Sequence, residues 1–268
     1  MTEAPGAPAA PVSAGTAGPA PTAGDGAAAA ARPARPPKPP SFLRQVLRIV
    51  GKDLRIEWRS REIVYTMAFL AVVVVLIFSF AFVVGDAKPP PPVTAGILWI
   101  AVIVSGTVGL GRTFDREREG ESIRSLLLSP APRAAIYLGK LTATVVLMLV
   151  VELVLVTLCG FLFTATIAAQ AGRIALLLGL GTIGFAAAGC VFSAALLRSR
   201  SRDVLLSTLL YPITVPIVIA GARGTSMVLD VVSPDLDAVL FWTQFLAGLA
   251  IIFVVVGLWA FEPVAAGE

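Results

Sequence analysis

Long apolar runs, separated by short charged segments, make up most of the chain beyond residue 62. A helix needs about 20 apolar residues to cross a hydrocarbon core about 30 Å thick. Lipid cannot satisfy free backbone amides, and the chain lacks the ten-residue alternating strands of a membrane barrel. The pattern therefore predicts an all-α integral membrane protein whose six transmembrane helices cover residues 63–85, 93–111, 141–163, 174–197, 204–222 and 238–261.

The segment SFLRQVLRIVGKDLRIEWRSRE, residues 41–62, precedes the first run and has a different pattern. Its apolar residues recur at helical spacing, and its arginines fall on another face, with Ser41 as a plausible N-cap. This predicts a basic amphipathic helix in the headgroup layer with Trp58 at its edge. Two interpretations stay open: a membrane anchor, or a docking surface for a cytoplasmic partner. The basic face consists of Arg44, Arg48, Arg55 and Arg59.

The first 40 residues are rich in Ala, Pro and Gly and lack large apolar side chains. Such a segment cannot bury enough surface to offset its chain entropy, so we predict a disordered tail. It has no apolar core of the kind a secretory signal peptide carries. A protein-docking arm is the alternative.

Basic residues are distributed unevenly between the segments that connect the apolar runs. Of 21 Lys and Arg residues, nine precede the first run, six lie between the second and third, and three lie in residues 198–203. The other connections hold only Lys88, Arg173 and Arg223. By the positive-inside rule, both termini, including the short segment 263–268, and the two basic connections are predicted to lie on the cytoplasmic side.

The sequence lacks the common catalytic and metal-binding motifs. It has no His, no GxxxxGK[ST], HExxH, CxxC or GxSxG pattern, and its two cysteines lie inside apolar runs. We therefore predict no catalytic residues, no metal site, no nucleic-acid partner and no ATP hydrolysis by this chain itself. An intramembrane enzyme is the least favoured class.

Four features inside the apolar runs have more than one interpretation or predict how the helices pack. Glu152 is an ionisable residue well inside a run, so it should face the bundle or be protonated, either on a substrate or proton path or as an interhelical hydrogen-bond partner. Gln244 is a weaker case, interpreted as interhelical glue. Pro212 and Pro216 should kink or break the fifth helix, as a static kink or a hinge. A small-residue face in the fourth helix predicts close packing and includes Gly179, Gly181, Gly184, Gly189 and residues 186–188.

The connection between the second and third runs carries the sequence REREGESIRSLLLSP. Ile123, Leu126 and Leu127 make one face of a short helix, which Gly120 precedes and Ser129-Pro130 should stop. This charged segment with a short helix and a Pro stop resembles the cytoplasmic coupling element of ABC-2-type transporter permeases. The charged residues that we expect to take part in coupling are Arg116, Glu117, Arg118, Glu119 and Arg124.

Within that superfamily the chain resembles the cytochrome c maturation permeases called haem exporter protein B, the CcmB-like family. The matching stretches are KDLRIEWRSRE, GILWIAVIVSG, SLLLSPAPRAAIYLGKL and RSRDVLLSTLLYPITVPIVIAGA, in the family's order and over roughly residues 43–260. Arg124 departs from the pattern, because an acid is common at that position. The Ala/Pro-rich tail is not part of the pattern.

The resemblance implies a permease subunit that works with a separate cytoplasmic ABC ATPase and other membrane subunits of cytochrome c maturation. Haem would be a transported or handled species rather than a tightly bound cofactor, and ATP would bind the partner. Without His, a His-ligated haem site is not expected in this chain. A homodimer and lipid contacts are further expected associations. Two rival functions stay open: an ABC-2 exporter of lipid, glycan or drug, and a non-transporting scaffold for cytochrome assembly.

Overall fold

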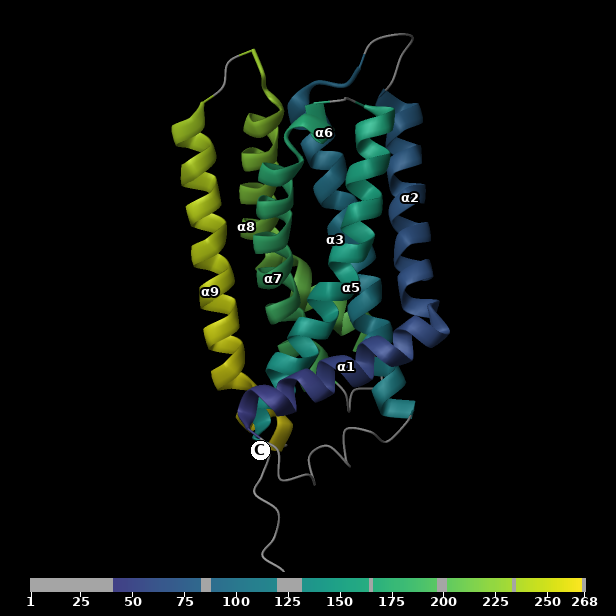
Figure 1. Cartoon of the computed structure of the whole chain (residues 1–268), viewed down its shortest axis with the longest axis vertical. Coiled ribbons are helices and arrows are strands. Elements are labelled where there is room, and N and C mark those ends of the chain that lie inside the picture. Colours follow the sequence, from purple (N-terminus) through teal and green to yellow (C-terminus); the bar gives the residue numbers. More distant parts are fainter. Residues whose placement is uncertain are drawn as a thin grey trace, which may run out of the picture. The chain divides into compact units, whose positions relative to one another are not determined.

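The computed structural model describes residues 41–82, 88–119, 132–163, 166–196, 202–232 and 235–266. Residues from Pro40 onward form one compact unit. Every regular element in the described ranges is a helix, and Figure 1 shows their order along the bundle. The helices are α1 (Phe42–Ser60), α2 (Glu62–Phe82), α3 (Pro91–Glu119), α5 (Arg133–Leu162), α6 (Thr166–Ala169), α7 (Ala171–Ala195), α8 (Arg202–Leu229) and α9 (Leu236–Ala266). The predicted tail lies outside the described residues.

Six helices in the described ranges are long and apolar enough to cross a membrane, which confirms the predicted number of spans. The third and the fifth exceed their predicted lengths the most. The third begins at Arg133 rather than at residue 141, because the Lys140 side chain is buried inside the bundle against the Asp53 carboxylate. The fifth continues past Arg223 to Leu229, because an arginine near a helix end can extend its charged head toward water.

Helices α3 and α7 form the interior of the bundle, and α9 lies at its edge. Among the six spans, α3 and α7 are the most buried and α9 is the least buried. Helix α7 packs against α5, α8 and α9, and α3 packs against α2, α5, α7 and α8. This arrangement accounts for Gln244: it lies on the exposed side of α9, so its interpretation as interhelical glue is wrong.

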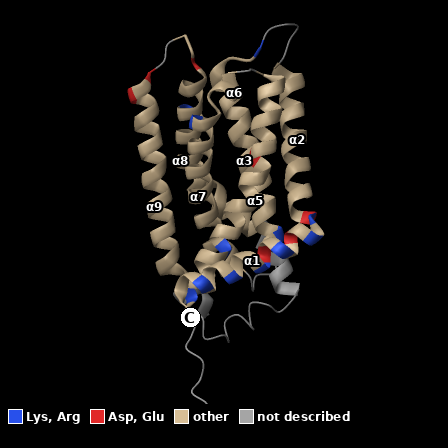
Figure 2. Cartoon of the chain, viewed as in Figure 1, with Lys and Arg blue, Asp and Glu red and all other residues tan. Residues whose placement is uncertain are grey.

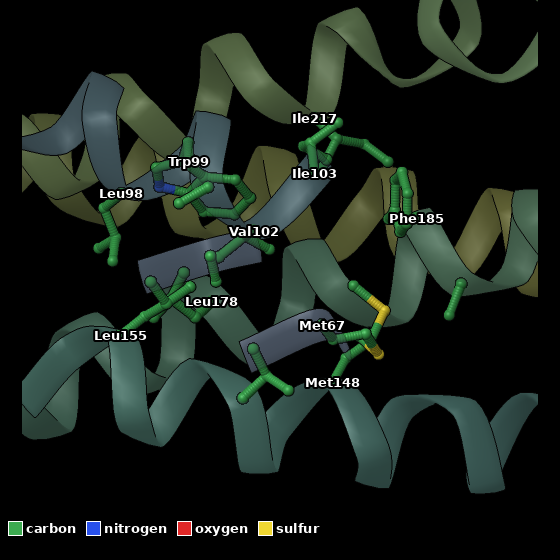
Figure 3. Close-up of a cluster of buried hydrophobic side chains, with 14 of the residues drawn as sticks. Met67, Leu98, Trp99, Val102, Ile103, Met148, Leu155, Leu178, Phe185 and Ile217 are labelled. Carbon is green, nitrogen blue, oxygen red and sulfur yellow. The ribbon is translucent and has the colours of Figure 1, made fainter. Parts of the chain in front are cut away.

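Trp99 of α3 is fully buried, and Figure 3 shows it among apolar side chains from neighbouring helices. Its ring lies directly over Gly181 of α7 and Gly221 of α8, where an added Cβ would overlap ring atoms. Its indole Nε1–H donates to Oγ1 of Thr225, at 3.0 Å. Without water to accept that hydrogen bond, Trp99 requires this partner from another helix.

The predicted small-residue face of the fourth span is confirmed at Gly181, Gly184 and Gly189. A Cβ at Gly189 would overlap Leu110 of α3, and one at Gly184 would lie 3.1 Å from Ile217 of α8. Gly179, in contrast, has open space beside it. The close contact of α7 with its neighbours therefore depends on three of the four glycines.

Helix α8 runs without interruption through Pro212 and Pro216. The prolines therefore do not break the helix. Thr214 lies between them, and its hydroxyl donates to the carbonyl oxygens of Leu210 and Tyr211 at 3.0 and 3.2 Å. Such bonds from a hydroxyl to the preceding turn satisfy polar groups inside the bilayer.

Candidate functional site

The end of the bundle that carries α1 collects the described basic side chains. Figure 2 shows Lys and Arg gathered along α1 and at the adjacent helix ends, whereas few lie at the opposite end. The connections from α3 to α5 and from α7 to α8 start and finish at this end (Figure 1). The structure thus brings together α1 and the described helix ends that flank the two basic connections.

Helix α1 has three distinct faces. Val46, Ile49 and Val50 are buried toward the bundle. The predicted basic residues Arg44, Arg48, Arg55 and Arg59 are exposed on another face. Between these two faces, by helical periodicity, runs an exposed apolar stripe of Leu43, Leu47 and Trp58. Ser41 is at the N-cap position, as predicted, although its hydroxyl makes no capping hydrogen bond.

A buried ion pair holds α1 against α5. Lys140 Nζ lies 2.7 Å from Asp53 Oδ2, and the Lys140 side chain is only 3% exposed. One residue earlier, a Cβ at Gly139 would lie 2.7 Å from Cγ2 of Ile49, so the two helices touch closely there. The pair neutralises a cation that would otherwise be costly to bury.

A fixed elbow joins α1 to the first span. Arg61 has a left-handed conformation with φ 55°, and it stands between the two helices. The buried Glu57 carboxylate accepts hydrogen bonds from the backbone N–H groups of Ile63 and Val64, at 2.8 and 3.0 Å. A carboxylate at the first turn caps the free amides and complements the helix dipole. Glu57 therefore sets the direction in which α2 leaves α1.

A second ion pair ties the start of α2 to α3. Arg112 Nη1 lies 3.0 Å from Glu62 Oε1, with both side chains largely exposed. Because exposed pairs contribute little free energy, this contact is better suited to orienting the end of α3 than to stabilising it. Arg112 stands one turn before the predicted coupling segment.

The coupling residues themselves are only partly within the described structure. Residues 116–119 belong to the last turn of α3, and their side chains are not described. Gly120, Ile123, Arg124, Leu126, Leu127, Ser129 and Pro130 lie outside the described residues, so the coupling helix stays a prediction. What the structure defines is its two attachment points, the end of α3 and the start of α5 at Arg133.

Glu152 faces the bundle, as predicted. Its side chain is 4% exposed, and the Thr182 hydroxyl of α7 donates a hydrogen bond to its Oε1. Its Oε2 has no hydrogen-bond partner among the described residues. The contact joins α5 to α7, which fits the interpretation of Glu152 as an interhelical hydrogen-bond partner. Oε2 is left for the alternative, a role on a substrate or proton path.

Sequence reasoning missed three of these contacts. The pairs Asp53–Lys140 and Trp99–Thr225 join residues far apart in the chain, and no local pattern indicates them. The capping role of Glu57 had a weak signal, namely an acid just ahead of a predicted membrane span.

Comparison with known proteins gives a consistent result. A family model described as "CcmB protein" matches residues 44–266. "Heme exporter protein B" of Haemophilus influenzae is 27% identical over 175 residues, which cover 65% of this chain and 77% of that protein. The protein of the same name from Pseudomonas aeruginosa is 27% identical over 179 residues, with the same two shares. That of Escherichia coli K12 is 33% identical over 101 residues, which cover 36% of this chain and 43% of that protein.

Proposed function

The chain belongs to the CcmB protein family, and on that premise we propose that it is the membrane permease subunit of a haem-export complex in cytochrome c maturation. The family match, which extends over residues 44–266, is the observation that carries the proposal. The relatives named "Heme exporter protein B" support the choice of haem as the handled species. In this role the chain helps to export haem or to release a haem-loaded chaperone.

The energy comes from a separate cytoplasmic ABC ATPase, because this sequence contains no phosphate loop. Ile123, Leu126 and Leu127 seat in a groove of that ATPase, and the charged residues of 116–124 set orientation and partner choice at the rim. Closure of the ATPase on nucleotide pushes the ends of α3 and α5. The buried Asp53–Lys140 pair supports this coupling, because a push on the start of α5 is then passed on to α1.

The α1 end of the bundle lies on the cytoplasmic side of a bacterial inner membrane, with α1 in the headgroup layer. The concentration of described Lys and Arg at that end supports this orientation. The exposed stripe of Leu43, Leu47 and Trp58 lies beside the basic face, an arrangement that suits acyl chains on one side and anionic headgroups on the other. It supports the membrane-anchor interpretation of α1 over the docking-surface interpretation.

Deletion of the gene, followed by a haem stain for c-type cytochromes, tests the proposed function. We expect their loss, with recovery when the full chain is supplied on a plasmid. Purification of the native complex should then recover an ABC ATPase and other membrane subunits of cytochrome maturation. Normal c-type cytochromes in the deletion strain would refute the proposal.

A further inference from the structure

The face of α9 that points away from the bundle is apolar, with one polar residue in its middle. Figure 1 shows α9 at the edge of the bundle, and its inner side packs against α5, α7 and α8. Outer residues recur at the spacing of three and four that is typical of a seam between two supercoiled helices. We call the following residues the outer seam of α9: Phe241, Gln244, Gly248, Ile251 and Val255.

Gln244 lies within the hydrocarbon core of the membrane. The span Leu236–Phe261 has 26 residues and extends roughly 39 Å, longer than a core of about 30 Å. With the core centred on the span, each end projects about 5 Å, and Gln244 lies about 12 Å from the first residue. Gln244 is the single carboxamide in the six apolar runs of the sequence. The outer seam therefore carries an exposed amide at a depth that water does not reach.

The amide of Gln244 has no hydrogen-bond partner among the residues that the structure describes. The neighbouring Thr243 differs, because its hydroxyl donates to the carbonyl oxygen of Val239 in its own helix, at 2.8 Å. A carboxamide has two N–H donors as well as an acceptor, which the preceding turn of one helix cannot all satisfy. Polar groups without a partner are costly in hydrocarbon, so Gln244 calls for a polar group on another helix.

Gly248 lies one helical turn from Gln244 in the same seam. An added Cβ there would meet nothing within 4 Å, so packing inside the chain does not require a small residue at this position. At Gly184, in contrast, an added Cβ would contact Ile217. Small residues at a membrane interface let two helices approach closely. A second helix against the outer seam would give Gly248 that role.

We propose that the outer seam of α9 binds the same seam of a second copy of this chain, with the Gln244 amides of the two copies hydrogen-bonded to each other. Two copies inserted in the same direction pair about a twofold axis along the membrane normal, so equal residues meet at equal depth. A carboxamide both donates and accepts, so two identical ones satisfy each other. The outer seam contains no charged residue, so the identical faces do not repel.

Disulfide cross-linking of the full chain in native membrane vesicles tests the proposal. Val255→Cys puts a thiol in the outer seam, and Val256→Cys puts one about 100° further around the helix. The two valines are 58% and 52% exposed at nearly the same depth, so the second variant is a matched control. Both native cysteines, Cys159 and Cys190, are buried. Because a disulfide needs Cα atoms within about 7 Å, we expect a linked dimer from Val255→Cys and little from Val256→Cys.

Three results of the cross-linking would overturn the proposal. The first is equal cross-linking of the two variants, and the second is no cross-linking of either. The third is a linked product of Val255→Cys in which mass spectrometry finds another protein instead of a second copy of this chain. None of these measurements involves haem or the ATPase, so this inference and the proposed function fail independently.

Variants of Gln244 test the hydrogen bond itself. Energy transfer between two fluorescently tagged copies, measured as lipid vesicles are diluted with further lipid, gives the strength of the dimer. We expect Gln244→Leu to weaken it roughly tenfold, as loss of interhelical hydrogen bonds from both copies predicts. Gln244→Asn keeps a carboxamide and should retain most of the affinity. Thr243→Val is the control and should change nothing, because that hydroxyl is satisfied within α9. The proposal is wrong if Gln244→Leu dimerises as tightly as the wild type, or if Thr243→Val loses as much.

Discussion

The ammonium of Lys140 lies 2.7 Å from the Asp53 carboxylate and joins the amphipathic helix α1 to the second turn of α5. The two residues are 87 positions apart in the sequence. Asp53 is 13% and Lys140 3% exposed, so neither charge is well solvated. Through this contact, a force on the start of α5 also acts on α1, the helix that leads into the first span.

Removing one partner of this pair should be far more harmful than removing both. Asp53→Ala leaves Lys140 buried without its counter-ion, and we expect a loss of about 3–5 kcal/mol in the free energy of unfolding. The double variant Asp53→Leu, Lys140→Met should recover most of that loss, because apolar residues can replace a buried pair at little cost. Thermal unfolding of the purified protein in detergent, followed by size exclusion, measures both.

Lys52 provides the control for this prediction. Its ammonium lies 3.4 Å from the other oxygen of Asp53, but its side chain is 44% exposed. Lys52→Met should therefore change the unfolding temperature little, since exposed pairs contribute at most about 1 kcal/mol. A single Asp53→Ala variant as stable as the wild type would show that the pair does not hold α1.

The second prediction concerns the contact of the Trp99 ring with Gly181 and Gly221. Alanine at Gly181 or Gly221 would place a Cβ against the indole ring, and we expect each to lower stability by about 1–3 kcal/mol. Gly179→Ala has open space and should be neutral or slightly stabilising, because alanine favours helix over glycine by about 1 kcal/mol. Unfolding temperatures of the three variants decide. If all three behave alike, the contact with Trp99 does not determine the packing.

The sequence pattern was sufficient for the number of spans, because six apolar runs of bilayer length leave few alternatives. The pattern did not predict the ends of the spans correctly, because a rule based on neighbouring residues ends a span at the first charged residue. Lys140 lies inside a helix because Asp53, on a distant segment, neutralises it. The interpretation of Gln244 was wrong for another reason. An amide in an apolar run suggests a partner inside the bundle, whereas α9 lies at the edge of the bundle.

The candidate site was predictable only in part. The basic face of α1 and the inward orientation of Glu152 follow from periodicity and from the cost of exposing a carboxylate to lipid. The space that Gly181 and Gly221 leave for the Trp99 ring could not be predicted in this way. Each glycine contributes half of a surface that exists only when α7 and α8 lie side by side. The coupling residues beyond Glu119 remain predictions from their pattern and resemblance alone.

A third prediction separates the two interpretations of Glu152. Glu152→Gln keeps an oxygen that can accept from Thr182, so a structural role predicts nearly normal c-type cytochrome levels. Thr182→Val removes the donor and should cost about 1 kcal/mol of stability, as interhelical hydrogen bonds in membranes typically do. Haem staining and unfolding temperature are measured on the same variants. Loss of cytochromes in a stable Glu152→Gln protein would instead assign the carboxyl group to a path.

The last prediction tests the proposed contact between the coupling helix and the ATPase. Replacing Leu126 and Leu127 with Asp puts two charges on the apolar face of the predicted coupling helix. Loss of even one buried anchor of an interface typically costs at least about 2 kcal/mol, so we expect co-purification of the ATPase to fall more than thirtyfold. The six spans do not include these positions, so membrane insertion should be unaffected.

Leu128 is the matched control for this variant, because helical periodicity places it away from the face formed by Ile123, Leu126 and Leu127. Leu128→Asp adds a charge to the same segment and should leave ATPase binding within about threefold of wild type, since few interface residues outside the anchors contribute strongly. Quantitative mass spectrometry of tagged complexes compares the two. Normal ATPase recovery with the Leu126 and Leu127 variant, or equal losses in both variants, would show that this face is not the ATPase contact.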